Sequence, residues 1–377
     1  MNARRFMAIA RKEFLHIRRD LRSLGLGIAI PVVLLLLFGY VLTLDVDRVS
    51  LAVWDRSRTP ESRELVSRFE GSRYFQVALR PEGYPGLEAA IDDGRALAAL
   101  VIPEDFAGRV RSDRPAAVQL FLDGSEANTA TIALGYAESV VSGYSADLEV
   151  RWAKAKGVQG VRPPLDVRSR VWFNTDLESR NFIIPGLISV IMMIIAALLT
   201  SLTVAREWEQ GTMEQLIATP VTATELILGK LVPYFVIGMA DLAVAVAMGK
   251  YLFHVPMRGS LLLLFGLAAV FQVGALSLGM LFSVAARSQL PASQMAMAFT
   301  FLPSYLLSGF VFSIDSMPRA VRAVTYFVPS RYFVRAIKGI YLKGVGLGTL
   351  AVDAALLLVF GSAMVLAAIR MFHKKLR

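Results

Sequence analysis

Six long apolar runs constrain this chain more than any other feature of its sequence. Each is close to the ~20 residues that a helix needs to span the hydrocarbon core of a bilayer. Prolines inside the runs are compatible with this, because neighbouring helices in a membrane bundle satisfy the freed backbone groups. The runs therefore predict an α-helical membrane protein with six transmembrane helices, at roughly residues 24–44, 182–204, 226–249, 260–285, 291–312 and 349–370.

Composition agrees with a membrane protein and excludes several kinds of site. Of the 377 residues, 55% are hydrophobic and 19% are charged. The chain has no cysteine, which excludes disulfides, thiolate metal sites and a cysteine nucleophile. The net charge of +10 comes mostly from arginines at the edges of the apolar runs, which favours anionic lipid over nucleic acid as a partner. The first run is too long and begins too late for a cleavable signal peptide.

Residues 1–23 predict a basic amphipathic helix before the first span. Apolar side chains recur there at helical spacing, with basic side chains between them. Such a helix lies in the headgroup plane with its arginines on the cytoplasmic side. The apolar stripe is Phe6, Ala10, Phe14, Ile17, Leu21 and Leu24, and the basic residues are Arg4, Arg5, Arg11, Lys12, Arg18, Arg19 and Arg22.

The long block between the first two runs, residues 45–181, then lies outside and predicts a periplasmic α/β domain. Strand-like and helix-like segments alternate over a length that can fold independently. Its sequence has no metal cluster, nucleophile elbow or phosphate loop, so we expect recognition or partner docking rather than chemistry. The segments are Val49–Trp54, Glu61–Phe69, Tyr74–Leu79, Gly86–Asp93, Leu97–Ile102, Glu104–Arg111, Ala117–Leu122 and a long helix near Glu126–Lys156.

A short polar elbow, residues 205–225, joins the second and third runs on the cytoplasmic side. Two segments in it, 212–215 and 222–225, fit the capping box, in which a Thr and a Glu or Gln three residues later satisfy backbone donors at a helix start. The first box predicts a helix of about two turns that ends before Pro220. A rigid element held between two spans is suited to transmit force from a soluble partner, although an ordinary interfacial loop fits the spacing equally well.

The membrane region, residues 182–377, has two further polar features. Asp241 lies deep inside the third run, where a carboxylate is either a hydrogen-bonding brace between helices or part of a proton or ion pathway. Residues 313–346 predict an external re-entrant hairpin, with Ser330 capping a second helix whose apolar side is Tyr332, Phe333, Ala336, Ile337, Ile340 and Tyr341. The six Lys and Arg residues of this hairpin contradict the positive-inside rule. The basic C-terminus, Arg370 to Arg377, predicts a cytoplasmic anchor.

Several segments resemble the permease subunit of bacterial ABC type-2 exporters. They run along nearly the whole chain, and the likeness is greatest to multidrug-type systems in which two similar permeases, an ATPase and a periplasmic adaptor protein work together. The segments are NFIIPG (181–186), LLTSLTVAREWEQGTMEQLIATPVTATELILGK (198–230), FLPSYLLSGFVFSIDSMP (301–318), PSRYFVRAIKGIYLKG (329–344), GRALAALVIPEDFA (94–107) and FLDGSEANTA (121–130).

The resemblance implies roles for particular segments. The elbow corresponds to the family's coupling helix, with Glu207, Glu209, Thr212, Met213, Glu214, Leu216, Ile217, Thr222 and Glu225 as the contact with the ATPase. Residues 1–23 correspond to the connecting helix, with Arg11, Phe14, Arg18 and Arg19 facing that subunit. The implied partners are an ATP-binding subunit, a second identical or paralogous permease, an adaptor protein and membrane lipids, in the bacterial inner membrane with both termini cytoplasmic.

The ATP site itself is not expected in this polypeptide. A phosphate loop needs GxxxxGK followed by Ser or Thr. The Gly-Lys pairs at 229–230 and 249–250 lack the upstream glycine and are followed by Leu231 and Tyr251. We therefore expect no catalytic residue, bound cofactor or metal here, with ATP and magnesium on the partner subunit.

Two other classes of function remain open from the sequence. One is a secondary transporter or cation efflux protein that uses Asp241, and ATP dependence of transport would separate it from an ATP-driven exporter. The other is a membrane-anchored sensor whose outer domain binds a ligand. Co-purification with a nucleotide-binding protein would separate the sensor from the exporter.

Overall fold

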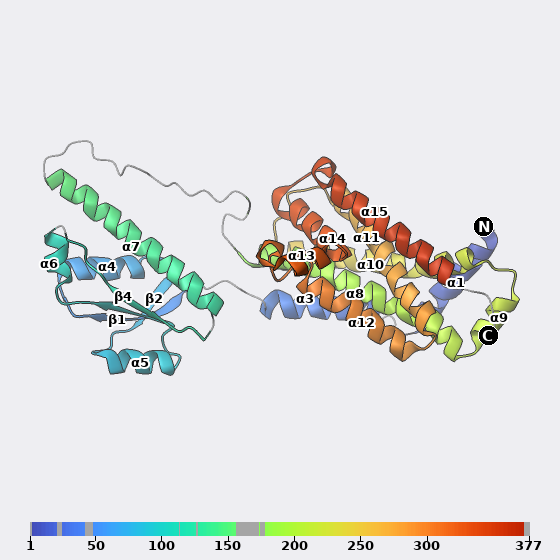
Figure 1. Ribbon diagram of the computed structural model, residues 1–377, viewed down its shortest axis with the longest axis horizontal. Coiled ribbons are helices and arrows are strands. Elements are labelled where there is room, and N and C mark those ends of the chain that lie inside the picture. The colour runs from blue at the N-terminus through green and yellow to red at the C-terminus, as the bar shows by residue number, and fades with distance from the viewer. Residues whose placement is uncertain are drawn as a thin grey trace. The chain divides into compact units, whose positions relative to one another are not determined.

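The computed structural model describes residues 2–20, 25–41, 48–112, 114–125, 127–155, 173 and 178–372. It divides into two compact units, one comprising Met1–Thr43 with Val171–Arg377 and the other Leu44–Arg170. The first unit is a helical bundle and the second an α/β unit (Figure 1). The predicted basic anchor beyond Phe372 lies outside the described residues.

Helix α8 (Arg180–Glu209) is the centre of the helical unit. It is packed against α3 (Ile30–Val41), α10 (Ala223–Tyr251), α11 (Leu261–Ala286), α12 (Gln289–Leu306) and α14 (Pro329–Lys338). Nearly every residue from Ile183 to Ala205 is buried. A helix that is apolar on all sides and covered on all sides is the expected core of a membrane bundle.

Small and polar residues bring α8 and α11 into close contact. A Cβ at Gly279 would lie 2.2 Å from the carbonyl oxygen of Ala197, so only glycine fits there. Thr200 donates a hydrogen bond of 2.8 Å to the Leu276 carbonyl, and Ser283 accepts hydrogen bonds from the α8 backbone at Val204 and Ala205. These features are typical of helix association in membranes.

Four described helices are long and apolar enough to cross a membrane: α8, α10, α11 and α15 (Leu347–Met371). The first apolar run forms a shorter apolar helix, Gly27–Val41, and its remaining ends lie outside the described residues. The fifth run forms α12, which has only 18 residues and includes Gln, Ser and Thr. The predicted count of six spans therefore stays a prediction.

The α/β unit contains a four-stranded sheet in the order β2-β1-β3-β4. Strand β1 (Val49–Asp55) pairs in parallel with β2 (Phe75–Leu79) and β3 (Ala98–Ile102), whereas β4 (Gln119–Leu122) is antiparallel to β3. Each strand and helix expected in this block has a counterpart within a few residues. The helices are α4 (Pro60–Glu70), α5 (Tyr84–Asp92), α6 (Phe106–Arg111) and α7 (Ala127–Ala155).

Alternation along the strands separates the two cores of this unit. Val49, Leu51 and Val53 of β1 face a core shared with α4, α6 and α7. Ala52 faces the opposite way, into a smaller core with α5. One sheet face is therefore covered by three helices and the other by one, as Figure 1 shows.

The hairpin region confirms its predicted apolar side but not its predicted cap. The elements are η2 (Ile314–Ser316), α13 (Arg319–Thr325), α14 and η3 (Gly339–Lys343). Tyr332, Phe333, Ala336, Ile337, Ile340 and Tyr341 are all buried. The prediction that Ser330 caps α14 is wrong: Pro329 already occupies the first turn, and the Ser330 hydroxyl lies 2.6 Å from that of Ser304, in the buried interior. Proline is favoured at that position because its missing N–H needs no partner.

Candidate functional site

The elbow between α8 and α10 contains one short helix, α9 (Thr212–Ala218). It ends before Pro220, as predicted. The capping box predicted at Thr212 is wrong, because Gly211 precedes the helix in a left-handed conformation (φ 68°) with no side-chain cap. The Thr212 hydroxyl instead donates to the Glu207 carbonyl at 3.3 Å. A glycine reverses the chain here at little cost, so α9 turns sharply away from the end of α8.

The second predicted capping box is confirmed. The Thr222 hydroxyl accepts from the Glu225 backbone N–H at 3.3 Å, and the Glu225 carboxylate accepts from the Thr222 N–H at 3.0 Å. This box begins α10. Helix α9 is thus held between two defined helix ends.

Helix α1 (Ala3–Arg19) lies along the first turns of α10. A Cβ at Gly229 would lie 2.9 Å from Ile9, so the glycine is what allows the two helices to approach. The buried face of α1 is Ile9, Ala10, Glu13 and Ile17. Phe14, another member of the predicted stripe, is 50% exposed, as an apolar side chain directed at lipid would be, so the stripe stays a prediction there.

A cluster of four charges, three of them buried, joins α1 to α8 and α10. The Lys230 ammonium lies 2.7 Å from Glu13 and 2.9 Å from Glu207, and Lys230 is only 1% exposed. Lys12 approaches Glu207 at 2.8 Å from the solvent side. The carboxylates and ammonium groups balance, which is the condition under which buried charges are tolerated. We call Lys12, Glu13, Glu207 and Lys230 the ion cluster.

Further polar contacts continue along α1 on both sides of the ion cluster. The Asn2 N–H donates to the Glu225 carboxylate at 2.5 Å, and the Arg5 guanidinium donates to the Pro220 carbonyl at 2.6 Å. Arg206, on the last turn of α8, pairs with Asp20 at 3.0 Å. Helix α1 is therefore attached to the elbow along its whole length.

These contacts change which predicted coupling residues can face a partner. Met213 is fully buried and Glu207 belongs to the ion cluster. Glu225 is buried in its capping box, and exposed Glu209 accepts hydrogen bonds from Ser288 and Gln289 at the start of α12. Met213, Glu207 and Glu225 are thus buried in this chain, and their predicted contact with the ATPase stays a prediction.

The residues that remain available form a compact surface on α9. Glu214 and Gln215 are exposed, and Glu214 makes no ion pair with any residue that the structure describes. Leu216 and Ile217 are half-buried, and Thr222 is exposed at the next helix start. On α1, the predicted contacts Arg11, Phe14, Arg18 and Arg19 are all exposed.

The ion cluster was missed by sequence reasoning, although a signal was present. Glu13 falls at helical spacing with Ile9 and Ile17, so it lies on the apolar face of α1. A lone carboxylate in such a stripe indicates a buried cationic partner. The sequence does not identify that partner, because Lys230 is 217 positions away.

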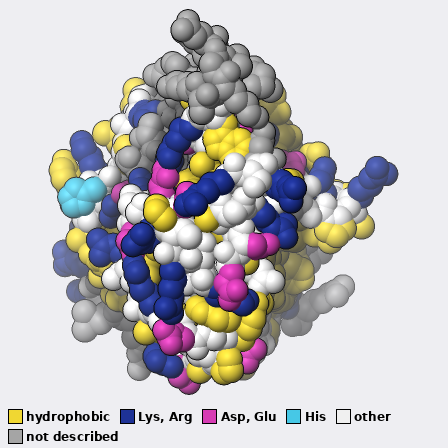
Figure 2. Space-filling model, turned by 90° about the vertical axis from the view of Figure 1, so that its left-hand side faces the viewer, with side chains coloured by type: hydrophobic (Ala, Val, Ile, Leu, Met, Phe, Trp, Pro, Cys, Tyr) yellow, Lys and Arg dark blue, Asp and Glu magenta, His cyan; other side chains and the backbone are white. Residues whose placement is uncertain are grey.

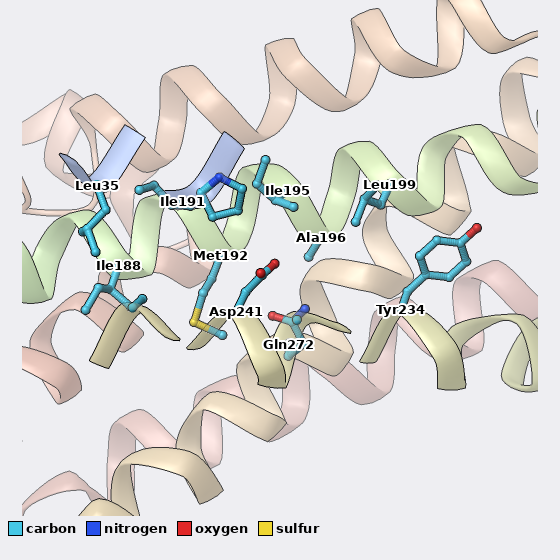
Figure 3. Close-up of a pocket in the computed structure, with 13 residues that line it drawn as sticks. Leu35, Ile188, Ile191, Met192, Ile195, Ala196, Leu199, Tyr234, Asp241 and Gln272 are labelled. Carbon is cyan, nitrogen blue, oxygen red and sulfur yellow. The ribbon is translucent and has the colours of Figure 1, made fainter. Parts of the chain in front are cut away.

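Asp241 lines a small pocket between α3, α8, α10 and α11 (Figure 3). Its side chain lies next to that of Gln272, and apolar residues of α8 close the opposite wall. The cavity holds about 20 Å³, room for roughly one water molecule. Asp241 makes no hydrogen bond to any described residue, and the Gln272 carbonyl oxygen is buried without a partner. The brace interpretation required a hydrogen bond to a neighbouring helix, so the role of Asp241 stays a prediction.

The α/β unit presents a surface of mixed charge. Figure 2 shows basic, acidic and hydrophobic side chains interspersed on one of its faces. Glu61 pairs with Arg111 at 2.8 Å, and the hydrogen bond from that guanidinium lowers the pKa of the carboxyl. The residues that the structure describes include no group of His, Asp and Glu able to hold a metal ion. A groove of about 450 Å³ lies beside α7, lined by residues such as Phe106, Val110 and Tyr144.

Comparisons with known proteins cover nearly the whole chain. The family model for the ABC-2 family transporter protein matches residues 22–370. The chain is similar to the probable multidrug ABC transporter permease YbhS of Escherichia coli, with 40% identity over 90% of this chain and 89% of that protein. It is 30% identical to the probable multidrug ABC transporter permease YbhR of the same organism, over 98% and 99% of the two chains. The inner membrane transport permease YhhJ is 27% identical over 88% and 86%.

Proposed function

Because the chain belongs to the ABC-2 family of transporter proteins, as a permease subunit without an ATPase of its own, we propose that it exports an amphipathic or hydrophobic molecule using ATP hydrolysed by a separate subunit. The names of YbhS and YbhR call those proteins probable multidrug permeases. By likeness to them, we propose drug-like molecules or lipids as the substrate class for this chain.

One observation carries the coupling part of the proposal. Helix α9 has one face buried through Met213 and another exposed through Glu214 and Gln215, and both of its ends are joined to long apolar helices. A displacement applied to the exposed face must therefore move the end of α8 or the start of α10. Since α8 is packed against most of the bundle, such a movement is passed on to the helices around it.

The contact surface that we propose for the ATP-binding subunit is Glu214, Gln215, Leu216 and Ile217, with the exposed arginines of α1 as a second, basic contact. Glu214 is the acidic centre of this surface, and Arg11, Arg18 and Arg19 supply the opposite charge. The ion cluster attaches α1 to α8 and α10, the two helices that flank α9, and so limits how far α1 can move relative to the elbow.

The number of spans, the topology and the partners that we propose are those implied by the family. We propose six spans in the bacterial inner membrane, with both termini and the elbow cytoplasmic and the α/β unit and residues 313–346 external. A second permease, identical or paralogous, completes the pathway. The α/β unit is the part that would meet a periplasmic adaptor protein.

The test is co-purification of the tagged permease with an ATP-binding protein, followed by ATPase measurement in proteoliposomes. Glu214→Arg reverses an exposed charge and leaves the interior unchanged, so it should weaken capture of the ATPase while the permease stays folded. Leu216→Ala with Ile217→Ala should cost about 2 kcal/mol of binding if these side chains are interface anchors. Glu138→Arg, on the exposed side of α7, is the matched control. Capture and ATPase activity equal to wild type in both elbow variants would refute the coupling surface.

A further inference from the structure

Four of the six cationic residues of the hairpin, which conflict with the positive-inside rule, line a large pocket. Its volume is about 800 Å³, within the range of sites that hold drug-sized ligands. It is enclosed by the start of α8, the segment after α12, helix α14, η3 and the start of α15. Since α8 has 30 residues and rises ~1.5 Å per residue, this pocket and the elbow lie at opposite ends of that helix.

The charge in the pocket is unbalanced. Arg331, Arg335, Lys338 and Lys343 line it, against the carboxylates Asp315 and Asp353. Asp353 is already paired with Arg335 at 2.5 Å, and it is the one carboxylate among the described residues that forms an ion pair with a lining cation. Excess positive charge with few counter-ions indicates a site for an anion.

Lys338 is a cation of this wall without a carboxylate partner among the described residues. It is half-buried, and its ammonium donates to the Gly309 carbonyl at 3.0 Å and lies 5.4 Å from the centre of the Phe182 ring. Gly186 makes room for it, because a Cβ there would lie 3.3 Å from the Lys338 side chain and 2.4 Å from Phe310. No carboxylate that the structure describes pairs with this ammonium.

The rest of the wall is apolar. Phe310, Val334, Leu342 and Leu350 contribute to it, and the space is many times larger than a phosphate ion requires. A ligand that satisfies both halves of the pocket has an anionic head and a hydrocarbon body. Lysine and arginine are the residues that bind phosphate. Basic pockets between membrane helices on the matrix or cytoplasmic side bind anionic lipid head groups, and the same charge chemistry applies to a basic pocket at the other end of the bundle.

We propose that this pocket binds the phosphate group of an anionic phospholipid, with the lipid chains along the apolar wall. The site explains why basic residues gather in a hairpin where topology rules disfavour them. It does not depend on the elbow or on the ATP-binding subunit, so it is tested on the permease alone.

The experiment titrates the purified full-length permease, in a neutral detergent, with dioctanoyl-phosphatidylglycerol and follows binding by thermophoresis. Dioctanoyl-phosphatidylcholine and inorganic phosphate are the comparison ligands. Lys343→Gln changes an exposed lining residue, and Lys338→Gln changes the half-buried one. Each should weaken binding of the anionic lipid roughly fivefold. Arg319→Gln, an exposed residue of the same hairpin outside the pocket, should leave it unchanged.

Two results would overturn the proposal. Equal affinity for the two lipids, or unchanged affinity in Lys343→Gln, would mean that the cations do not bind the head group. If inorganic phosphate binds as tightly as the lipid, the pocket is a site for free anions and the proposal that it binds a phospholipid is wrong. Should Lys338→Gln fail to fold, Lys343→Gln still decides the question because its side chain is exposed.

Discussion

Replacing Lys230 by methionine should release α1 from the bundle. The ammonium group contacts two carboxylates, at 2.7 and 2.9 Å, in a place where the residue is 1% exposed. Methionine keeps most of the volume but leaves Glu13 and Glu207 facing one remaining cation, Lys12. Removing one partner of a buried ion pair costs about 3–5 kcal/mol, because a charge is left buried without compensation.

Lys12→Met is the matched control for this change. It removes a cation from the same cluster, but the Lys12 side chain is 53% exposed. Water already screens this pair on the Lys12 side, and Glu207 keeps Lys230 at 2.9 Å, so the expected loss is about 1 kcal/mol or less. Both variants remove one positive charge, so a much larger loss of stability in Lys230→Met than in Lys12→Met would show that burial of the lysine, and not the number of charges, sets the cost.

The readout is the distance between α1 and α9, measured by spin labels. The chain has no native cysteine, so Arg11→Cys and Gln215→Cys, both at exposed positions, can be labelled alone. The distribution of distances between the two spin labels should be narrow in the otherwise wild-type chain and in Lys12→Met, and broad in Lys230→Met. Adding Glu13→Gln to Lys230→Met removes the excess carboxylate and should restore a narrow distribution. A narrow distribution in Lys230→Met, with an unchanged thermal midpoint, would refute the reasoning.

Three further outcomes are expected. Gly279→Ala should destabilise the permease by about 1–3 kcal/mol in a thermal unfolding assay, because the added Cβ would clash with the backbone of α8. Gly266→Ala, in the same helix, is the control: its added Cβ has no heavy atom within 4 Å, so the stability should not change. Ser316→Cys should react with a membrane-impermeant thiol reagent from outside intact cells and Gln215→Cys only after lysis; the reverse pattern would contradict the proposed topology. Asp241→Asn should keep substrate transport in proteoliposomes if the carboxylate only packs, whereas loss of transport with normal assembly would indicate a proton or ion pathway.

Local signals allowed the sequence to predict most helices and strands. The box at Thr222, the helix end before Pro220 and the strand at Val49–Trp54 each depend on neighbours within a few residues. The same reasoning failed at Thr212, because a Gly in a left-handed conformation can begin a helix without any side-chain cap. It failed at Ser330 because a hydroxyl that can cap a helix can equally bond across to Ser304.

The candidate site depends on contacts that no local pattern contains. The elbow contains four carboxylates, Glu207, Glu209, Glu214 and Glu225, and from the sequence all four are candidates for one acidic contact surface. In the structure three of them bind other parts of the chain: Glu207 pairs with Lys230, Glu209 accepts hydrogen bonds from the start of α12, and Glu225 accepts from its own helix cap and from Asn2. Apart from the cap at Thr222, each partner lies more than twenty positions along the sequence from the carboxylate that it binds. Glu214 differs only in that α9 turns its side chain outward. What distinguishes an interface carboxylate from a structural one here is therefore long-range packing around the elbow. Helix α10 supplies Lys230, the start of α12 supplies the partners of Glu209, and α1 reaches Glu225 through the close approach to α10 that Gly229 permits.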